Sequence, residues 1–158
     1  MTLAPSRGEL EGSTTMRGEI VNDEQTIDDI LHQAKNVAVV GLSDNRMRPS
    51  FGVAEYLQKQ GYHIIPVNPG VEQVLGEKSY PDLASVPEQI DVVDVFRRPE
   101  HVPAIVEEAI KAGARSLWLQ DGVGNPEVEK NARQAGLRVV ADTCMMREHR
   151  RLRREGKI

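Results

Sequence analysis

The sequence lacks most features that mark secreted, membrane-spanning and metal-binding proteins. Among its 158 residues there is one cysteine, Cys144, so no intramolecular disulfide can form, as is usual in a reducing compartment. No apolar run approaches the ~20 residues of a membrane span, and residues 1–7 have no apolar segment of the kind found in secretory signals. The four histidines are not spaced as metal ligands with each other or with Cys144. These absences predict a cytoplasmic protein without a membrane or metal partner.

The net charge of −4 is unevenly distributed along the chain. Residues 147–158 contain six Lys or Arg and two Glu, so the remaining chain carries a net charge of −8. A fold of that charge is a poor polyanion binder, which argues against nucleic acid as a partner. The basic segment itself has two interpretations. It is either a solvated helix end that the helix dipole favours, or a local attraction for phosphate groups.

Apolar patterning predicts one α/β domain. Residues 1–22 are rich in Ser, Thr and Gly and are predicted to be a flexible tail, and residues 23–155 form the domain. A leading helix is expected over about 24–34. Five short apolar runs then predict strands, at Val37–Leu42, Ile64–Val67, Val92–Phe96, Leu117–Leu119 and Val139–Ala141.

Helical patterns separate these runs, which implies a mainly parallel five-stranded sheet between helical layers. Helices are predicted over about 51–60, 102–112, 126–135 and 145–154, with Pro or a capping residue at several starts and Gly at several ends. Ser50 is the expected cap of the helix over 51–60. The link over 70–89 is expected to be an irregular crossover with a short helical turn near 81–85.

A phosphate-binding loop is predicted where the first strand meets the next helix. The segment Val37-Ala-Val-Val-Gly-Leu-Ser43 ends in a glycine turn, and Arg48-Pro-Ser50 precedes the helix. Gly41 allows a tight turn and a close approach of the ligand, and the free N–H groups at a helix start suit an anion. The loop is not the G-x-G-x-x-G of dinucleotide enzymes, because Ser43 and Arg46 replace the second and third glycines. The alternative is a plain turn with solvated arginines.

The end of the second strand argues against NAD. NAD sites usually place Asp or Glu there to bind the ribose hydroxyls, whereas this strand ends in Pro66-Val67-Asn68-Pro69. A neutral residue suits a ribose with a 3′-phosphate better, as in coenzyme A. Asn68-Pro69 is also an ordinary turn signal, so it counts mainly against NAD.

The other strand ends supply further candidates but no catalytic set. Phe96 and Arg97 follow the third strand, and Gln120 follows the fourth. Cys144 is followed by His149 but has no evident orienting group, so a buried thiol is the simpler interpretation. We therefore identify no catalytic residue from the sequence.

Six motifs in order resemble the small, stand-alone CoA-binding proteins, over about residues 24–153. The motifs are Val-Ala-Val-Val-Gly-Leu-Ser, Arg-Pro-Ser, Ile-Pro-Val-Asn-Pro, Leu-Gly-Glu-Lys-Ser-Tyr-Pro, Val-Asp-Val-Phe-Arg-Arg-Pro and Leu-Trp-Leu-Gln. That family resembles the N-terminal CoA-binding domain of the succinyl-CoA synthetase α subunit. The synthetase's phosphorylated histidine belongs to a second domain, which has no counterpart in this sequence.

The resemblance implies a Rossmann-like fold that binds coenzyme A, or an acyl-CoA, along the strand ends. It places Gly41, Leu42, Ser43, Arg48 and Ser50 at the pyrophosphate. It places Val67, Asn68 and Pro69 beside the adenosine, Phe96 and Arg97 along the pantetheine or phosphate path, and Gln120 near the thiol.

The hypothesis is therefore non-catalytic binding of coenzyme A or an acyl-CoA. Two alternatives stay open. One is an NAD(P)-linked oxidoreductase or a CoA-transferring enzyme fragment, and the other is a regulatory protein whose ligand state controls a protein partner.

Overall fold

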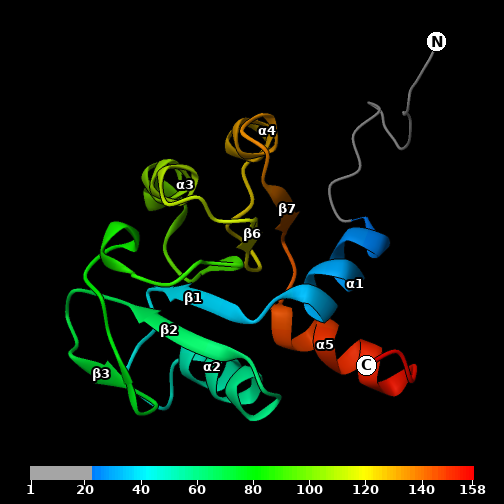
Figure 1. Ribbon diagram of the computed structural model, residues 1–158, viewed down its shortest axis with the longest axis horizontal. Helices are drawn as coiled ribbons and strands as arrows, with labels where there is room; N and C mark the ends of the chain where they lie inside the picture. Colours follow the sequence, from blue (N-terminus) through cyan, green and yellow to red (C-terminus); the bar gives the residue numbers. More distant parts are fainter. Residues whose placement is uncertain (1–22) are drawn as a thin grey trace.

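A five-stranded parallel sheet runs through the centre of the computed structural model, which describes residues 23–158 (Figure 1). The predicted tail over residues 1–22 lies outside the described residues. The strand order is β2-β1-β5-β6-β7, and every neighbouring pair is parallel. The strands are β1 (Asn36–Val40), β2 (His63–Val67), β5 (Val92–Val95), β6 (Ser116–Leu119) and β7 (Arg138–Ala141). The predicted α/β, Rossmann-like fold is confirmed.

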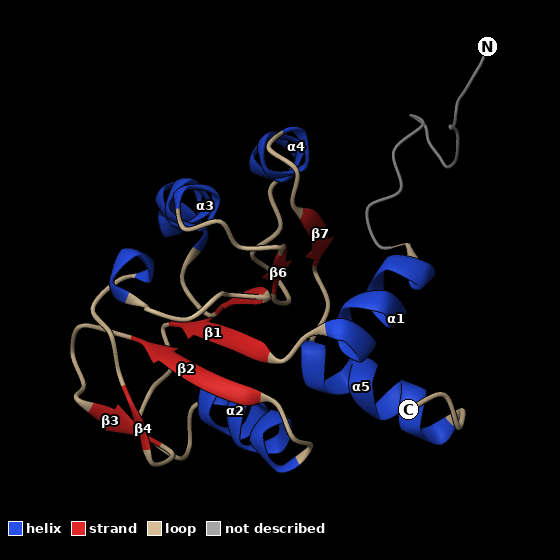
Figure 2. Cartoon of the chain, in the orientation of Figure 1, coloured by secondary structure: helices blue, strands red, loops and turns tan. Residues whose placement is uncertain are grey.

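Helices cover both faces of the sheet (Figure 2). One layer contains α1 (Glu24–Gln33), α2 (Pro49–Lys59) and α5 (Met145–Arg154). The other contains α3 (Val102–Lys111) and α4 (Pro126–Gln134). Side chains alternate along each strand, so Val37 and Val39 pack toward the first layer and Ala38 and Val40 toward the second. This alternation divides the core into two clusters and buries both faces of the sheet. None of these helices, which lie within residues 23–158, is long and apolar enough to cross a membrane.

Capping residues explain where the helices begin. Asn125 caps α4 as predicted, because its side chain accepts hydrogen bonds from the N–H groups of Glu127 and Val128. The prediction that Ser50 caps α2 was wrong. Its N-cap is Arg48, and Ser50 lies inside the first turn because Pro49 takes the first helical position.

The crossover from β2 to β5 contains a small hairpin that the sequence did not predict. Two-residue strands β3 (Gln73–Val74) and β4 (Glu77–Lys78) pair antiparallel beside β2 (Figure 2). A 3₁₀ turn, η1 (Leu83–Ser85), follows within the predicted helical segment, and a second, η2 (Pro99–His101), precedes α3.

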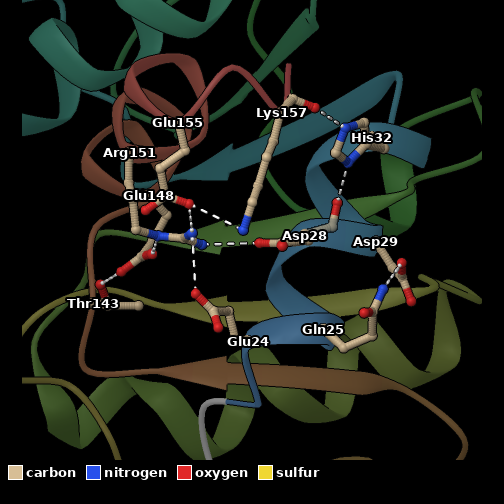
Figure 3. A network of polar contacts seen from close by, with 10 residues as sticks. All are labelled: Glu24, Gln25, Asp28, Asp29, His32, Thr143, Glu148, Arg151, Glu155 and Lys157. Atoms are coloured by element: carbon tan, nitrogen blue, oxygen red, sulfur yellow. Dashed lines mark hydrogen bonds and ion pairs between the residues drawn. The ribbon is translucent and has the colours of Figure 1, made fainter.

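A cluster of ionic contacts fixes α5 against α1 (Figure 3). The guanidinium of Arg151 contacts Asp28 at 2.9 Å, Glu148 at 3.1 Å, Glu155 at 3.2 Å and Glu24 at 3.3 Å. Asp28 and Glu148 raise the pKa of Arg151, most strongly through the hydrogen bond to Asp28. These contacts hold α5 in place against α1.

Candidate functional site

A cleft of about 1320 Å³ lies along the carboxyl edge of the sheet. Ligand pockets are commonly ~300–1,000 Å³, so this cleft has room for an elongated molecule. The loops after β1, β2, β5 and β6 form its floor, and residues of α2 and α5 form its walls. β1 and β5 are neighbours here although β2 lies between them in the chain. Such a switch in strand order is where open parallel sheets bind ligands.

The turn after β1 is determined by its neighbour across the switch point. Gly41 has a φ of +87°, and its N–H donates to the carbonyl of Val67 at 2.9 Å. A Cβ at this position would collide with the carbonyl oxygen of Phe96 and would lie 2.8 Å from Cδ of Arg97. From the sequence, Gly41 was expected to allow a ligand to approach the backbone closely. The structure shows that the Phe96–Arg97 backbone and side chain already require glycine.

Two serines organise the predicted phosphate loop. The N–H of Ser43 donates to Oγ of Ser50 at 3.1 Å, and Oγ of Ser43 accepts from the N–H of Asn45 at 3.0 Å. Both hydroxyl oxygens therefore act as acceptors, which leaves both hydroxyl hydrogens available to donate toward the cleft. This arrangement joins the start of α2 to the end of β1 and presents two donors suited to an anion.

Arginines line the same end of the cleft. Arg48, Arg97 and Arg98 all border it and form no ion pair within residues 23–158. Arg46, the other arginine of the loop, is not part of the lining and instead has its guanidinium 5.5 Å from the ring of Phe51. The geometry therefore distinguishes two arginines that the sequence could not separate.

Asn68 has a structural task in addition to its place on the cleft. Its Nδ2 donates to the carbonyl of Leu42 at 2.9 Å, and its Oδ1 accepts from the N–H of Gly70 at 2.8 Å. The side-chain amide thus ties the end of β2 to the loop after β1. This use of the amide agrees with the turn interpretation of Asn68-Pro69.

The far end of the cleft lies over β6 and β7 and is less charged. Gln120, Val123, Cys144 and Met146 line it. Arg147 is there too, but it makes a two-pronged ion pair with Asp121, with N–O distances of 3.1 and 2.9 Å. The hydrogen bond from Arg147 holds the pKa of Asp121 below its usual value. Much of the positive charge at this end is therefore already neutralised.

α2 and α5 meet behind the cleft through buried polar groups. Tyr56 lines the cleft, and its hydroxyl lies 2.9 Å from Nδ1 of the buried His149. Arg150, also on the lining, has its guanidinium 5.1 Å from the Tyr56 ring. Burial lowers the pKa of His149. We conclude that neutral histidine is the form that supports this wall.

Nine of the eleven residues predicted from the sequence line one cleft. They are Gly41, Ser43, Arg48, Ser50, Asn68, Pro69, Phe96, Arg97 and Gln120. The other two, Leu42 and Val67, are buried in the core instead, with exposed fractions of 0% and 4%. Apart from Ser50, the lining residues of α2 and α5 were not predicted from the sequence; they include Tyr56, Arg147 and Arg150. Their only signal was the basic segment after residue 147, whose position against α2 depends on tertiary packing.

No group of three or more His, Cys, Asp or Glu within residues 23–158 is arranged to hold a metal ion.

Comparison with known proteins finds a matching family model and several similar proteins. A family model for the CoA binding domain matches residues 35–150. The uncharacterized protein YneT of Bacillus subtilis is 40% identical over 123 residues, which are 78% of this chain and 91% of that protein. The solved structure of a hypothetical protein from Pyrococcus horikoshii has a TM-score of 0.80 and 42% identity, covering 90% of this chain and 98% of that one.

A larger enzyme shares the same region. The ADP-forming acetate–CoA ligase II of Archaeoglobus fulgidus is 29% identical over 119 residues. These are 73% of this chain but 18% of the ligase.

Proposed function

This chain belongs to the CoA-binding domain family, and from that membership we propose that it binds coenzyme A or an acyl-CoA without catalysing a reaction on it. The observation that carries the proposal is the cleft at the β1/β5 switch point, because its two ends differ in charge. One end is cationic and rich in hydrogen-bond donors. The other is largely apolar apart from one carboxamide and one ion pair.

The phosphate groups belong at the cationic end. Four residues near the start of α2 line the cleft there and carry hydroxyl or guanidinium groups: Ser43, Ser50, Arg48 and Arg97. Phosphate oxygens accept from hydroxyl and guanidinium donors, and the amino end of a helix favours negative charge. This loop is the phosphate loop of the proposed function.

The pantetheine arm extends from the phosphates across β5 and β6. Phe96 and Val123 offer apolar surface along this path, and Gln120 and Cys144 lie where it ends. A long arm with apolar segments and two amide groups matches such a lining better than a second nucleotide would. This difference favours coenzyme A over NAD as the ligand.

Calorimetry with coenzyme A, NAD and NADP tests the binding, using protein that native mass spectrometry has shown to be free of ligand. Coenzyme A is expected to bind more tightly than either dinucleotide. Arg97→Gln should weaken the binding about tenfold, since it removes a charge-assisted hydrogen bond. Arg115→Gln, at the opposite edge of the sheet, is the matched control and should leave the affinity unchanged. No heat or thermal shift with coenzyme A or acetyl-CoA would refute the proposal.

A separate experiment tests the absence of catalysis. The protein is incubated with acetyl-CoA, alone and with ADP and phosphate, and free thiol is followed over time. We expect no thiol release above the rate without protein. Release that saturates with acetyl-CoA would show that the chain is an enzyme.

A further inference from the structure

Asp94 is a fully buried acid directly beneath the cleft. It lies in β5, in register with Val39 of β1 and Trp118 of β6, and its exposed fraction is 0%. Its place in the strand points it toward the layer of α1, α2 and α5, the same side as Trp118. A carboxyl group at a central strand position of a parallel sheet is unusual, because such positions are normally apolar.

Folding gains nothing evident from this carboxyl group. One oxygen, Oδ2, is buried and has no hydrogen-bond partner within the described residues. Burial raises the pKa of Asp94 to about 7, opposed by the hydrogen bond from Gln120. A valine or leucine would fill the site without these penalties. A buried acid that opposes stability, next to a pocket, is a candidate for a role in the site.

The one side-chain hydrogen-bond partner of Asp94 within residues 23–158 is a residue of the cleft. Nε2 of Gln120 donates to Oδ1 of Asp94 at 2.5 Å. Gln120 has an exposed fraction of 7%, and it borders the cleft at the end over β6. A carboxamide has two N–H donors on its nitrogen and one acceptor oxygen on the other side of the group. Because the bond to Asp94 holds the nitrogen on the side of β5, the acceptor Oε1 of Gln120 is left for the cleft.

We propose that Asp94 is a positioning residue that fixes Gln120 as a hydrogen-bond acceptor for the arm of the ligand. The inference rests on the proposed function, since it assumes that the arm ends over β6. The site then takes a ligand that brings a donor to Gln120, either an amide N–H or the thiol of the arm. An acyl carbonyl oxygen at the same point is disfavoured, because two acceptors would face each other.

The test measures the affinities of three ligands for the wild type, Asp94→Leu and Gln120→Met. The ligands are coenzyme A, acetyl-CoA and 3′,5′-ADP, which has the adenosine, the 3′-phosphate and the first 5′-phosphate but no arm. Both variants should weaken coenzyme A binding about three- to tenfold, the effect of one hydrogen bond. Both should leave 3′,5′-ADP within about twofold of the wild type, because the nucleotide end does not reach Gln120. A general structural defect would weaken both ligands together.

The affinity for acetyl-CoA identifies which group of the ligand donates the hydrogen bond to Gln120. If the variants weaken acetyl-CoA and coenzyme A alike, the donor is an amide N–H. If they weaken coenzyme A alone, the donor is the thiol. Either result supports the inference.

Two results overturn it: equal weakening of coenzyme A and 3′,5′-ADP, or no change with either. Failure of the proposed function is distinct, because the wild type would then bind neither ligand. Thermal melts of both variants show that the compared proteins are folded.

Discussion

Single residues of this protein take their properties from neighbours far along the chain. The carbonyl oxygen of Phe96 leaves no room for a Cβ at Gly41, and the carboxyl group of Asp94 accepts a hydrogen bond from Gln120. The ring nitrogens of His32 lie 2.7 and 2.6 Å from the carbonyl oxygens of Asp28 and Lys157, and these contacts raise its pKa. The sequence showed the glycine turn, but no sequence pattern singled out His32. Its contact with Lys157 appears only when the chain is folded.

The glycine at position 41 should be essential for stability. Gly41→Ala places a Cβ against the carbonyl oxygen of Phe96 and strains a φ of +87°. We expect the free energy of unfolding to fall by about 2 kcal/mol or more. Gly52→Ala is the control, because Gly52 lies in α2 with nothing within 4 Å of its added Cβ. That variant should gain about 0.5–1 kcal/mol. Urea denaturation compares the two, and equal losses would contradict the contact at Gly41.

Asp94 should make stability depend on pH in a defined window. Its pKa is about 7 in the folded protein and near its ordinary value of 3.8 when unfolded. The folded state therefore holds the proton more tightly, so stability falls as pH rises through about 7. Between pH 5 and pH 8 this loss is on the order of 2–3 kcal/mol. Asp94→Leu should remove it, which urea denaturation of both proteins at the two pH values measures. Parallel changes in the two proteins would show that Asp94 does not titrate in this range.

At the scale of secondary structure, regular patterns were predictable and the hairpin was not. Strand runs and Pro-to-Gly punctuation placed all five strands and five helices to within about two residues, apart from the turn-sized elements. The turn between β3 and β4 has Leu75 at φ 54° and Gly76 at φ 78°. Leucine rarely adopts positive φ, so no Asn-Gly type of signal marks this turn. Its conformation is imposed by the pairing of the crossover with β2, which includes the bridge from Val67 to Tyr80.

The contact between α1 and α5 should depend on one guanidinium. Arg151→Met removes the shared partner of Asp28, Glu148 and two further carboxylates and leaves them facing one another. We expect a loss of about 1–3 kcal/mol in the free energy of unfolding. Arg154→Met is the matched control on the same helix, because Arg154 is exposed and makes no ion pair within residues 23–158. Urea denaturation distinguishes the two; similar stabilities would mean that the cluster contributes nothing.

At the scale of the whole molecule, topology explains which lining residues of the cleft could be predicted from the sequence and which could not. The rule that ligands bind at the carboxyl ends of parallel strands located the loops after β1, β2, β5 and β6 from the sequence. Eight of the nine predicted residues that line the cleft lie in those loops, and the ninth, Ser50, lies in the first turn of α2. The walls from α2 and α5 depend on how two helices 85 or more residues apart pack, which local patterns do not encode. Tyr56 and Arg150 could not be predicted for that reason.

The charge distribution predicts how salt affects binding. The sequence has a net charge of −4, yet the cleft is lined by six Arg or Lys side chains and two acidic ones. Attraction for a phosphorylated ligand is therefore local, and added salt screens it. We expect the affinity for coenzyme A to fall roughly three- to tenfold between about 50 mM and 500 mM NaCl. Arg97→Gln should flatten this dependence and Arg115→Gln should not. A dependence unchanged by Arg97→Gln would place the phosphates elsewhere.

One helix faces the cleft on one side and the amino-terminal helix on the other. The cleft is lined by Met146, Arg147 and Arg150 of α5 and by its N-cap, Cys144. Arg151, the residue after Arg150, contacts α1. Local unfolding that detaches α5 therefore disrupts the cleft wall and the contact with α1 together. An occupant of the cleft that restrains α5 should also slow the exchange of amide hydrogens with deuterium in α1, a segment without a residue on the cleft lining. Motion at the start of the domain would then report whether the cleft is filled.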